Sequence, residues 1–274
     1  MGNGAENKNG ECTVLVCSCD NYADVLAPFA VLWRKFWPDC PFRMALVTET
    51  MPEDRMCFDQ IVACGAGDTW CSMLVRALER ISTPYVMLLC NDYYLTGRVD
   101  TGNVLKRLDD MKRLGANSLR LIPNPAPGKA HAVKVEGESG LYRYNAMSAY
   151  CVATQAGFWR REYLLALARP LKSAWEFERF GSFDPLTAER PVLVTAEKEF
   201  PFVDAVHKGY WETFGLEACR AAGIDTSAFK RTLPPFTARV REAVKAFLFA
   251  VLPVDAIVRF QNRFGLGATS TPRV

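Results

Sequence analysis

The chain has 274 residues, of which half are hydrophobic and 23% are charged, so we expect a packed core and exclude global disorder. The formal net charge is only +3, which argues against nucleic acid as the main partner. No run of eighteen apolar residues exists, and the polar first eleven residues lack the apolar core of a signal peptide. We therefore expect neither a membrane-spanning helix nor an export signal.

The ten cysteines would suit a disulfide-linked secreted protein, but their positions favour another interpretation. Cys17, Cys64, Cys90 and Cys151 lie within apolar runs, where cysteine behaves as a small hydrophobic residue. The pair Cys17 and Cys19 has no second pair at the spacing of a zinc site. We therefore expect free thiols and a location in the reducing cytoplasm.

The first half of the chain alternates between predicted strands and helices. Helical spacing of apolar residues predicts helices over 26–36 and 73–81, the second with Asp68 or Thr69 as its N-cap. Unbroken apolar runs predict buried strands over 13–17, 42–47, 60–64 and from Tyr85 to a stop at Asn91 and Asp92. This alternation predicts an α/β fold of the Rossmann-like, doubly wound kind, with a mixed, mostly parallel central sheet flanked by helices.

The second half is less regular. It holds a predicted helix over 104–114 and an amphipathic helix over 158–168. Two further strands are predicted over 118–122 and 192–195. The Pro/Gly-rich stretch 123–140 predicts a long loop that would serve as a lid or bind an acceptor.

The position of Asp92 gives the first functional prediction. Right-handed crossovers would bring the ends of the first and fourth strands to one edge of the sheet, so Asp20 and Asp92 would face one crevice. Ligands of open α/β sheets bind outside the carboxyl ends of the strands, where a carboxylate can bind a divalent metal and, through it, phosphate oxygens. The alternative is that Asn91 and Asp92 are turn residues.

Two later groups of charged residues could act together with a metal-bound phosphate at Asp92. Glu176 and Glu178 lie among aromatic residues, and His207 is followed by Lys208. A metal-bound pyrophosphate needs a carboxylate, often an imidazole, and a cation on its phosphates. A hydroxyl acceptor needs a carboxylate base.

The order of these motifs resembles a known family. The buried strand followed by Asn91-Asp-Tyr-Tyr-Leu95, then Trp175-Glu-Phe-Glu178, then His207-Lys-Gly-Tyr-Trp211, resembles the GT-A-fold nucleotide-sugar glycosyltransferases. It is similar in particular to bacterial enzymes of cell-surface polysaccharide and lipopolysaccharide synthesis that carry an Asp-Asp-Tyr/Phe-Phe/Tyr-Leu motif. The resemblance covers roughly residues 13–211.

The resemblance implies a hexosyltransferase that moves a sugar from a nucleotide-diphospho-sugar to a hydroxyl of a glycan or lipid-linked acceptor. It implies Mn²⁺ or Mg²⁺ on Asp92 and His207, and Glu178 as the acceptor's base, with Glu176 as second choice. The residues predicted to contact the donor nucleotide or its diphosphate are Ser18, Asp20, Tyr22, Asp68, Trp70, Asn91 and Lys208.

Several alternatives stay open from the sequence. Asn91 stands where the family has an aspartate, so a metal-independent enzyme that uses Lys208 and nearby arginines is one of them. His207 could be structural, Trp70 could be a core residue, and Glu176 and Glu178 could lie on a solvated helix face. Other functions left open are a non-catalytic glycan-binding or scaffold protein and a sugar-phosphate nucleotidylyltransferase. The nucleotidylyltransferase usually needs a Gly-rich loop, and residues 18–22 contain no glycine.

The end of the chain differs from the rest in charge. From Lys230 onward it holds eight basic and two acidic residues, a net charge of +6, which leaves −3 for the preceding part. Helical spacing of its apolar residues predicts a basic amphipathic helix. We expect a catalytic domain over 1–228 and a tail over 229–274, which contacts the inner face of the membrane through 236–264 or packs on the domain.

Overall fold

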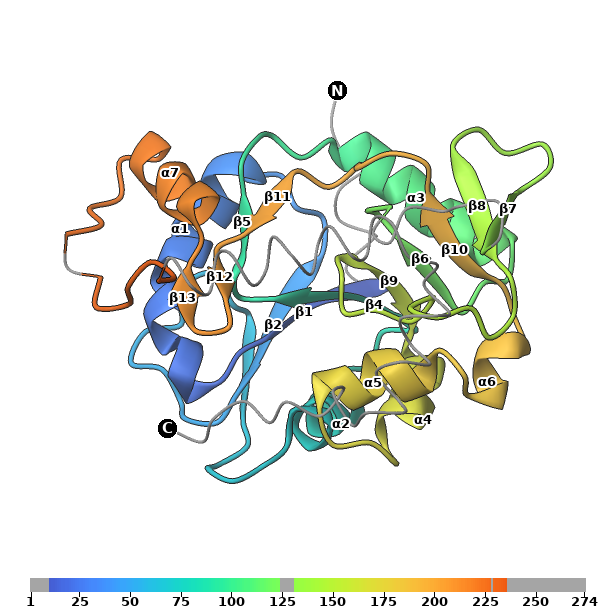
Figure 1. Ribbon diagram of the computed structural model, residues 1–274, viewed down its shortest axis with the longest axis horizontal. Coiled ribbons are helices and arrows are strands. Elements are labelled where there is room, and N and C mark those ends of the chain that lie inside the picture. The colour runs from blue at the N-terminus through green and yellow to red at the C-terminus, as the bar shows by residue number, and fades with distance from the viewer. Residues whose placement is uncertain (1–9, 124–130, 228, 236–274) are drawn as a thin grey trace.

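The computed structural model describes residues 10–123, 131–227 and 229–235. Its centre is one nine-stranded sheet in the order β3-β2-β1-β4-β9-β6-β10-β8-β7, with helices on both faces (Figure 1). Seven strands run in one direction, while β9 and β8 run against them. The predicted mixed, mostly parallel α/β sheet is therefore confirmed.

The first half of the chain follows the predicted alternation closely. Its strands are β1 (Cys12–Cys17), β2 (Arg43–Thr48), β3 (Gln60–Ala63) and β4 (Tyr85–Cys90). Its helices are the 3-10 helix η1 (Asp20–Val25), α1 (Leu26–Phe36), α2 (Trp70–Arg80) and α3 (Thr101–Arg113). Thr69 caps α2 through a capping box with Ser72, which confirms one of the two predicted caps.

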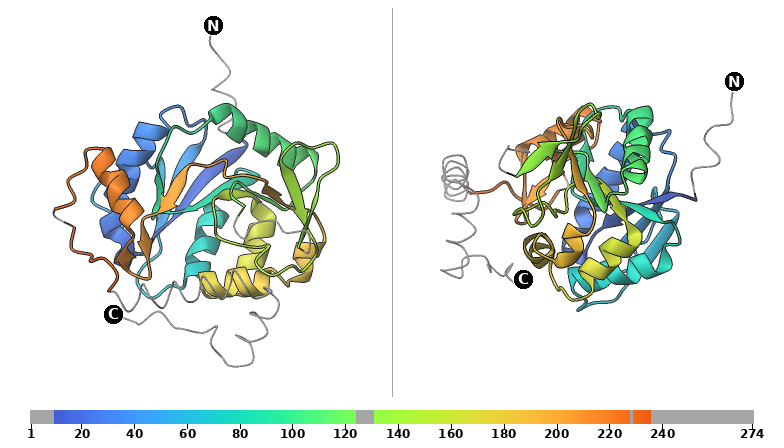
Figure 2. Two further views of the ribbon diagram at one scale, coloured as in Figure 1. Left: turned by 45° about the horizontal axis from the view of Figure 1, so that its top comes forward. Right: turned by 90° about the vertical axis from the view of Figure 1, so that its right-hand side faces the viewer.

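Both faces of the sheet are buried, which explains why its strands lack alternation. Val14 and Val16 of β1 lie in a core cluster with residues of α1 and α3. Leu15 and Cys17 lie in the other cluster, with residues of α2, α4 (Arg161–Ala168) and α5 (Ala174–Gly181). Figure 2 shows the sheet between these two helix layers. Successive side chains of a strand point to opposite faces, so a doubly covered strand needs apolar residues at every position.

The second half corrects one prediction. The stretch expected to be a helix from Phe158 begins instead as β9 (Gly157–Arg160), which runs antiparallel between β4 and β6 (Ser118–Arg120). A Cβ at Gly157 would lie 2.7 Å from the backbone oxygen of Leu119, so this close approach requires glycine. A four-residue apolar strand directly before a helix cannot be separated from that helix by periodicity.

The predicted long loop over 123–140 is also partly wrong, although residues 124–130 of it lie outside the described residues. Ala132–Lys134 forms β7, which pairs with β8 (Leu141–Tyr144) at the edge of the sheet. β8 in turn pairs with β10 (Val192–Thr195), the strand predicted with these bounds. The short helix α6 (Pro185–Ala188) precedes β10.

Smaller elements cover one end of the sheet. The chain leaves the sheet after β4, and β5 (Tyr93–Leu95) pairs with β11 (Phe202–Asp204) in a separate ribbon. A hairpin of β12 (Val206–His207) and β13 (Tyr210–Trp211) follows, and then α7 (Thr213–Ala221), which lies near α1 in Figure 1.

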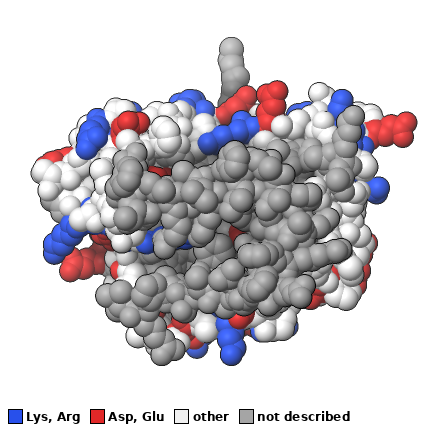
Figure 3. Space-filling model, viewed as in Figure 1, with Lys and Arg blue, Asp and Glu red and all other residues white. Residues whose placement is uncertain are grey.

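Residues 229–235 lie against this hairpin, because the backbone N–H of Trp211 donates to the oxygen of Thr232 at 2.9 Å. The boundary predicted between residues 228 and 229 stays a prediction. The proposed membrane-contacting residues 236–264 lie outside the described residues. Within residues 10–235, apart from the undescribed gaps, no helix is long and apolar enough to cross a bilayer. On the face shown in Figure 3, acidic and basic side chains of the described residues lie interspersed around the edge.

Candidate active site at the carboxyl end of β4

The site begins where the order of the strands reverses. The chain passes from β1 to β2 and β3 on one side, then returns with β4 on the other side of β1. Cys17 and Cys90, the last residues of β1 and β4, are paired, and the backbone N–H of Asn91 donates to the oxygen of Cys17 at 3.1 Å. A crevice outside the carboxyl ends of strands at such a reversal is the usual ligand site of open α/β sheets.

Asn91 joins the loops that follow β1 and β4. Its side chain is buried, with 2% of its surface exposed, and its Nδ2 donates to Ser18 Oγ at 2.9 Å and to the backbone oxygen of Tyr22 at 2.8 Å. An aspartate carboxylate could not donate to a carbonyl oxygen, so the amide is required here. The asparagine at this position, where the motif it resembles has an aspartate, thus has a structural reason. Contact of Asn91 and Ser18 with a nucleotide stays a prediction.

Asp92 lies at the opening of the site, where its backbone is hydrogen-bonded and its side chain is half-buried. Its carbonyl oxygen accepts from the N–H of Ala205 at 2.7 Å, which ties β4 to the residue after β11. Burial, followed by the nearby charge of Asp204, raises the pKa of Asp92 to about 7, although the guanidinium of Arg231 works against this rise. A carboxyl group with these neighbours is suited to bind a cation or exchange a proton near neutral pH.

Glu178 approaches the same region from α5. Its Oε1 accepts from the backbone N–H and the hydroxyl of Thr154, both at 2.7 Å. Tyr93, the residue after Asp92, donates its hydroxyl to the oxygen of Thr154 at 3.3 Å. Asp92 and Glu178 both act electrostatically on Cys90 and Tyr93, so the two predicted carboxylates share one neighbourhood.

The other predicted residues on this side make structural contacts. Glu176 Oε2 accepts from the backbone N–H of Lys172 at 2.8 Å in the first turn of α5. Asp68 accepts from Ser72 Oγ at 3.1 Å and pairs with Arg76 at 3.2 Å. The Trp70 ring packs on Phe177 with centroids 5.5 Å apart. These contacts support the alternative of a packing role for Trp70.

Asp20 and Tyr22 lie in the loop after β1, but they face different neighbours. The Asp20 carboxylate accepts from the backbone N–H of Thr50 at 3.0 Å and from its hydroxyl at 2.7 Å, so it ties the loops after β1 and β2 together. Tyr22 lies closer to Asp92, because burial and then the charge of Asp92 raise the pKa of its hydroxyl. Of the two residues, Tyr22 therefore lies near Asp92 at the predicted crevice, whereas Asp20 is hydrogen-bonded to Thr50.

Arg231 lies near the end of the described residues and is hydrogen-bonded to the segment that follows β1. Its guanidinium donates to both carboxylate oxygens of Asp24 at 3.1 and 2.7 Å and to the backbone oxygens of Asn21 and Gly209 at 2.5 and 3.0 Å. It also lies 4.8 Å from the centre of the Tyr22 ring. Only 13% of the side chain is exposed. Sequence reasoning missed this residue because two of its partners, Asn21 and Asp24, lie more than 200 positions earlier.

His207 and Lys208 belong to the hairpin beside Asp92. Lys208 and Gly209 both have positive φ, +51° and +84°, and form the two-residue turn between β12 and β13. Both His207 and Lys208 are exposed. His207 lines a cavity of about 380 Å³ whose lining residues are Ile122, Gln155, Lys198, Phe202, Val203, Asp204, His207, Glu212 and Phe214.

Asp204 is the main functional candidate that the sequence reasoning missed. It ends β11 opposite Tyr93 and lines the cavity. The residue as a whole is exposed, but desolvation of its carboxyl group raises the pKa of that group, and Lys198 and His207 lower it in part. The signal that identified Asp92, a carboxylate at the carboxyl end of a strand, also applies to Asp204, but β11 has only three residues and leaves no clear apolar run.

The comparisons with known proteins concern the fold. No protein-family model and no curated protein matches the chain. Its fold is similar to that of S. aureus TarS 1-349, at 11% identity and a TM-score of 0.44, over 70% of this chain and 59% of that one. It is also similar to TarS 1-349 in complex with UDP-GlcNAc, at 10% identity and a TM-score of 0.42, over 77% of this chain and 65% of that one.

A third similar structure is a UDP-glucose pyrophosphorylase complexed with UDP-glucose, at 10% identity and a TM-score of 0.44. The match covers 70% of this chain and 92% of that one. By contrast, the matches to the two TarS structures cover less than two thirds of the length of those chains.

Proposed function

We propose that the protein is a glycosyltransferase that moves a sugar from a nucleotide-diphospho-sugar to a hydroxyl of a glycan or lipid-linked acceptor. The observation that carries this proposal is the group of carboxylates around Tyr93, where the strand order reverses. Asp92 is contributed by the end of β4, Glu178 by α5 and Asp204 by β11. Each is held by different contacts, so donor and acceptor chemistry can be separated between them.

The donor side of the proposal concerns Asp92. Among the described residues, no group of three or more His, Cys, Asp or Glu side chains is placed to hold a metal ion. Asp92 and Asp204 are two carboxylates whose charges interact, which fits a cation that takes its other ligands from a diphosphate and water. When bound there, Mn²⁺ or Mg²⁺ would neutralise charge on the leaving diphosphate. Asp92, with Asp204 or His207, would hold it.

The acceptor side of the proposal concerns Glu178. Both hydrogen bonds from Thr154 go to Oε1, and Oε2 accepts no hydrogen bond from the described residues, so Oε2 is available to take a proton. In the transfer, the bond from the anomeric carbon to the diphosphate oxygen breaks and a bond to the acceptor oxygen forms. The acceptor's hydroxyl proton passes to Glu178, and the nucleoside diphosphate leaves with the electron pair. Thr154 fixes the orientation of the base.

A second candidate function is a sugar-phosphate nucleotidylyltransferase. The loop after β1 contains no glycine to cradle a triphosphate, and its Asp20 is engaged with Thr50, which favours the transferase. The two reactions release different products. A glycosyltransferase releases a nucleoside diphosphate from a nucleotide-sugar, whereas a nucleotidylyltransferase releases pyrophosphate from a nucleoside triphosphate.

A thermal-shift screen of nucleotide-sugars, with and without Mn²⁺, tests the donor side. A ligand at 100 times its dissociation constant stabilises a fold by roughly 2.7 kcal/mol, which gives a clear shift. We expect a Mn²⁺-dependent shift that Asp92→Ala abolishes and that Asp109→Ala, at an exposed position on α3, leaves unchanged. A shift without Mn²⁺ would instead favour a metal-independent enzyme that uses Lys208. The proposal fails if no nucleotide-sugar shifts the protein, and a non-catalytic glycan-binding or scaffold role would then replace it.

The place of the reaction in the cell is a further part of the proposal. A lipid-linked acceptor of cell-surface polysaccharide synthesis would be met at the inner face of the membrane. The net charge of +6 from Lys230 onward supports contact with an anionic surface. Residues 236–264, which were predicted to make this contact, lie outside the described residues.

A further inference from the structure

The cavity beside Asp92 has walls from several separate parts of the chain. Asp204 and His207 come from β11 and β12, Glu212 and Phe214 from the start of α7, and Gln155 from the segment before β9. Its volume of about 380 Å³ falls within the range of small-molecule sites. The cavity is therefore large enough for a ligand rather than only for water.

The wall from α7 is fixed in place by close packing. The backbone N–H of Glu212 donates to the oxygen of Ala205 at 2.8 Å. A Cβ at Gly215 would lie 2.5 Å from the Cα of Ala205, so α7 approaches the chain between β11 and β12 as closely as the backbone allows. Glu212 and Phe214 are thus held at a set distance from Asp204, as a pre-formed binding site requires.

The charges of the cavity do not favour an anionic ligand. Asp204 and Glu212 contribute two carboxylates, against the single ammonium of Lys198 and the imidazole of His207. Lys198 Nζ already donates to the backbone oxygen of Phe202 and lies 5.0 Å from the centre of its ring. A phosphate or carboxylate would meet two negative groups there, and a strongly bound phosphate calls for arginine or unengaged lysine.

The same groups suit a neutral molecule that carries many hydroxyls. Carboxylates accept from hydroxyl groups, and the amide of Gln155 can both donate and accept. Phe214 adds an aromatic ring with 67% of its surface exposed, and Phe202 forms an apolar wall that is 2% exposed. A sugar ring offers the matching combination of an apolar face of C–H groups and an edge of hydroxyls.

The cavity also lies next to the proposed base. Gln155 follows Thr154, which holds Glu178 through two hydrogen bonds. Tyr93 connects both sides, because its ring stacks on Phe202 at 4.4 Å while its hydroxyl donates to the oxygen of Thr154. A ligand in the cavity would therefore lie on the Glu178 side of Asp92.

We propose that this cavity binds the acceptor as a neutral sugar ring, with Phe214 stacked on its apolar face and Gln155 and Glu212 bound to its hydroxyls. This inference rests on the proposed glycosyl transfer and adds the acceptor's chemical class: the residue that receives the new sugar is itself an uncharged sugar. The nucleotide and its diphosphate occupy the adjacent crevice at the end of β4.

Saturation-transfer NMR on the full chain tests the proposal, with the methyl glycosides of glucose, galactose, mannose and N-acetylglucosamine as neutral probes. Glucuronic acid and glucose 6-phosphate serve as charged probes. We expect at least one neutral glycoside to bind more tightly than either charged probe. Phe214→Ala should weaken that binding at least tenfold, whereas Phe183→Ala, which removes an aromatic ring 43% exposed outside the cavity, should leave it unchanged.

Three results would overturn the inference: no binding of any neutral glycoside, tighter binding of a charged probe, or equal binding by the Phe214→Ala variant. The nucleotide-sugar thermal shift, measured on the same samples, separates this failure from failure of the proposed function. A nucleotide shift without glycoside binding would overturn only the cavity's role. Glycoside binding without any nucleotide shift would overturn glycosyl transfer, and with it the acceptor role, while the cavity would remain a sugar site.

Discussion

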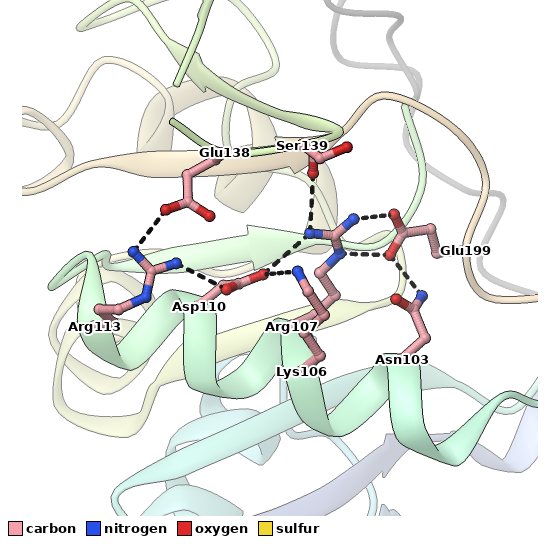
Figure 4. A network of polar contacts seen from close by, with 8 residues as sticks. All are labelled: Asn103, Lys106, Arg107, Asp110, Arg113, Glu138, Ser139 and Glu199. Carbon is pink, nitrogen blue, oxygen red and sulfur yellow. Dashed lines mark hydrogen bonds and ion pairs between the residues drawn. The ribbon is translucent and has the colours of Figure 1, made fainter. Parts of the chain in front are cut away.

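Two groups of charged side chains in this molecule shift the pKa of a carboxyl group in opposite directions. The first lies on α3, where Figure 4 shows Arg107 between the carboxylates of Asp110 and Glu199. Asp110 also binds Lys106 and Arg113 at 2.9 Å each. Burial alone would raise the pKa of Asp110, but hydrogen bonds from Lys106, Arg113 and Arg107 bring it below its ordinary value.

The second group lies at the end of β4. Asp92 forms no ion pair with any residue of the described chain, and its neighbour Asp204 has the same charge. Its pKa moves in the opposite direction to that of Asp110. The α3 group joins a helix to the segments that hold Glu138 and Glu199, so it has a structural role. The β4 group destabilises the fold while it is ionised, and a carboxylate with a raised pKa and no ion-pair partner among the described residues is typical of a functional site.

The largest effect expected from this contrast is on activity. Glu178→Gln keeps an oxygen that can accept from Thr154 but removes the group that takes the acceptor's proton. We expect the transfer rate to fall by about a thousandfold, while the nucleotide-sugar thermal shift remains. The matched control is Glu176→Gln on the same helix, whose side chain accepts from the backbone N–H of Lys172, and its rate should stay within a few-fold of wild type. Equal loss in both variants would contradict the role of Glu178.

The next effect is on stability through the α3 group. Arg107→Met keeps most of the side-chain volume but leaves Glu199 and Asp110 without their main cation. Breaking a buried pair costs about 3 kcal/mol or more, which urea denaturation would measure as a lower midpoint. The control Arg98→Met breaks the ion pair between Arg98 and Asp39. The two side chains are 64% and 49% exposed, so the loss should cost under about 1 kcal/mol. If both variants lose the same stability, the α3 group is not a structural centre.

The smallest effect has the opposite sign. Asp92→Asn removes a carboxylate whose pKa is about 7 in the folded protein and near 4 when unfolded, a difference that corresponds to about 4 kcal/mol for a fully buried group. Because Asp92 is only half-buried, solvent screening reduces this value, and the variant should be more stable by about 2 kcal/mol at pH 8. The wild type loses this stability as the pH rises from about 4 to 7, because the folded state holds the proton longer. Denaturation of both proteins at pH 4 and pH 8 should therefore show a difference only at pH 8. A less stable variant at pH 8 would mean that the ionised carboxylate has a stabilising partner.

The sequence by itself determined the elements whose signals are local. The buried strands β1 to β4 and β10, the helices α1 to α3 and the Thr69 cap follow from apolar runs, helical spacing and capping chemistry within about fifteen neighbouring residues. The position of Asp92 directly after β4 followed from the same rules, since a doubly wound sheet places its site at the carboxyl ends of its strands.

The tertiary structure decided whatever depends on residues far apart in the chain. The insertion of β9 between β4 and β6 depends on the close approach of Gly157 to Leu119. The amide of Asn91 is explained only by its contact with Tyr22, 69 positions earlier. The pairing of β5 with β11 brings Asp204 beside Asp92 across more than a hundred positions. Periodicity reports which face of an element is buried, but it carries no information about which distant segment covers that face, and the candidate site is built from such distant contacts.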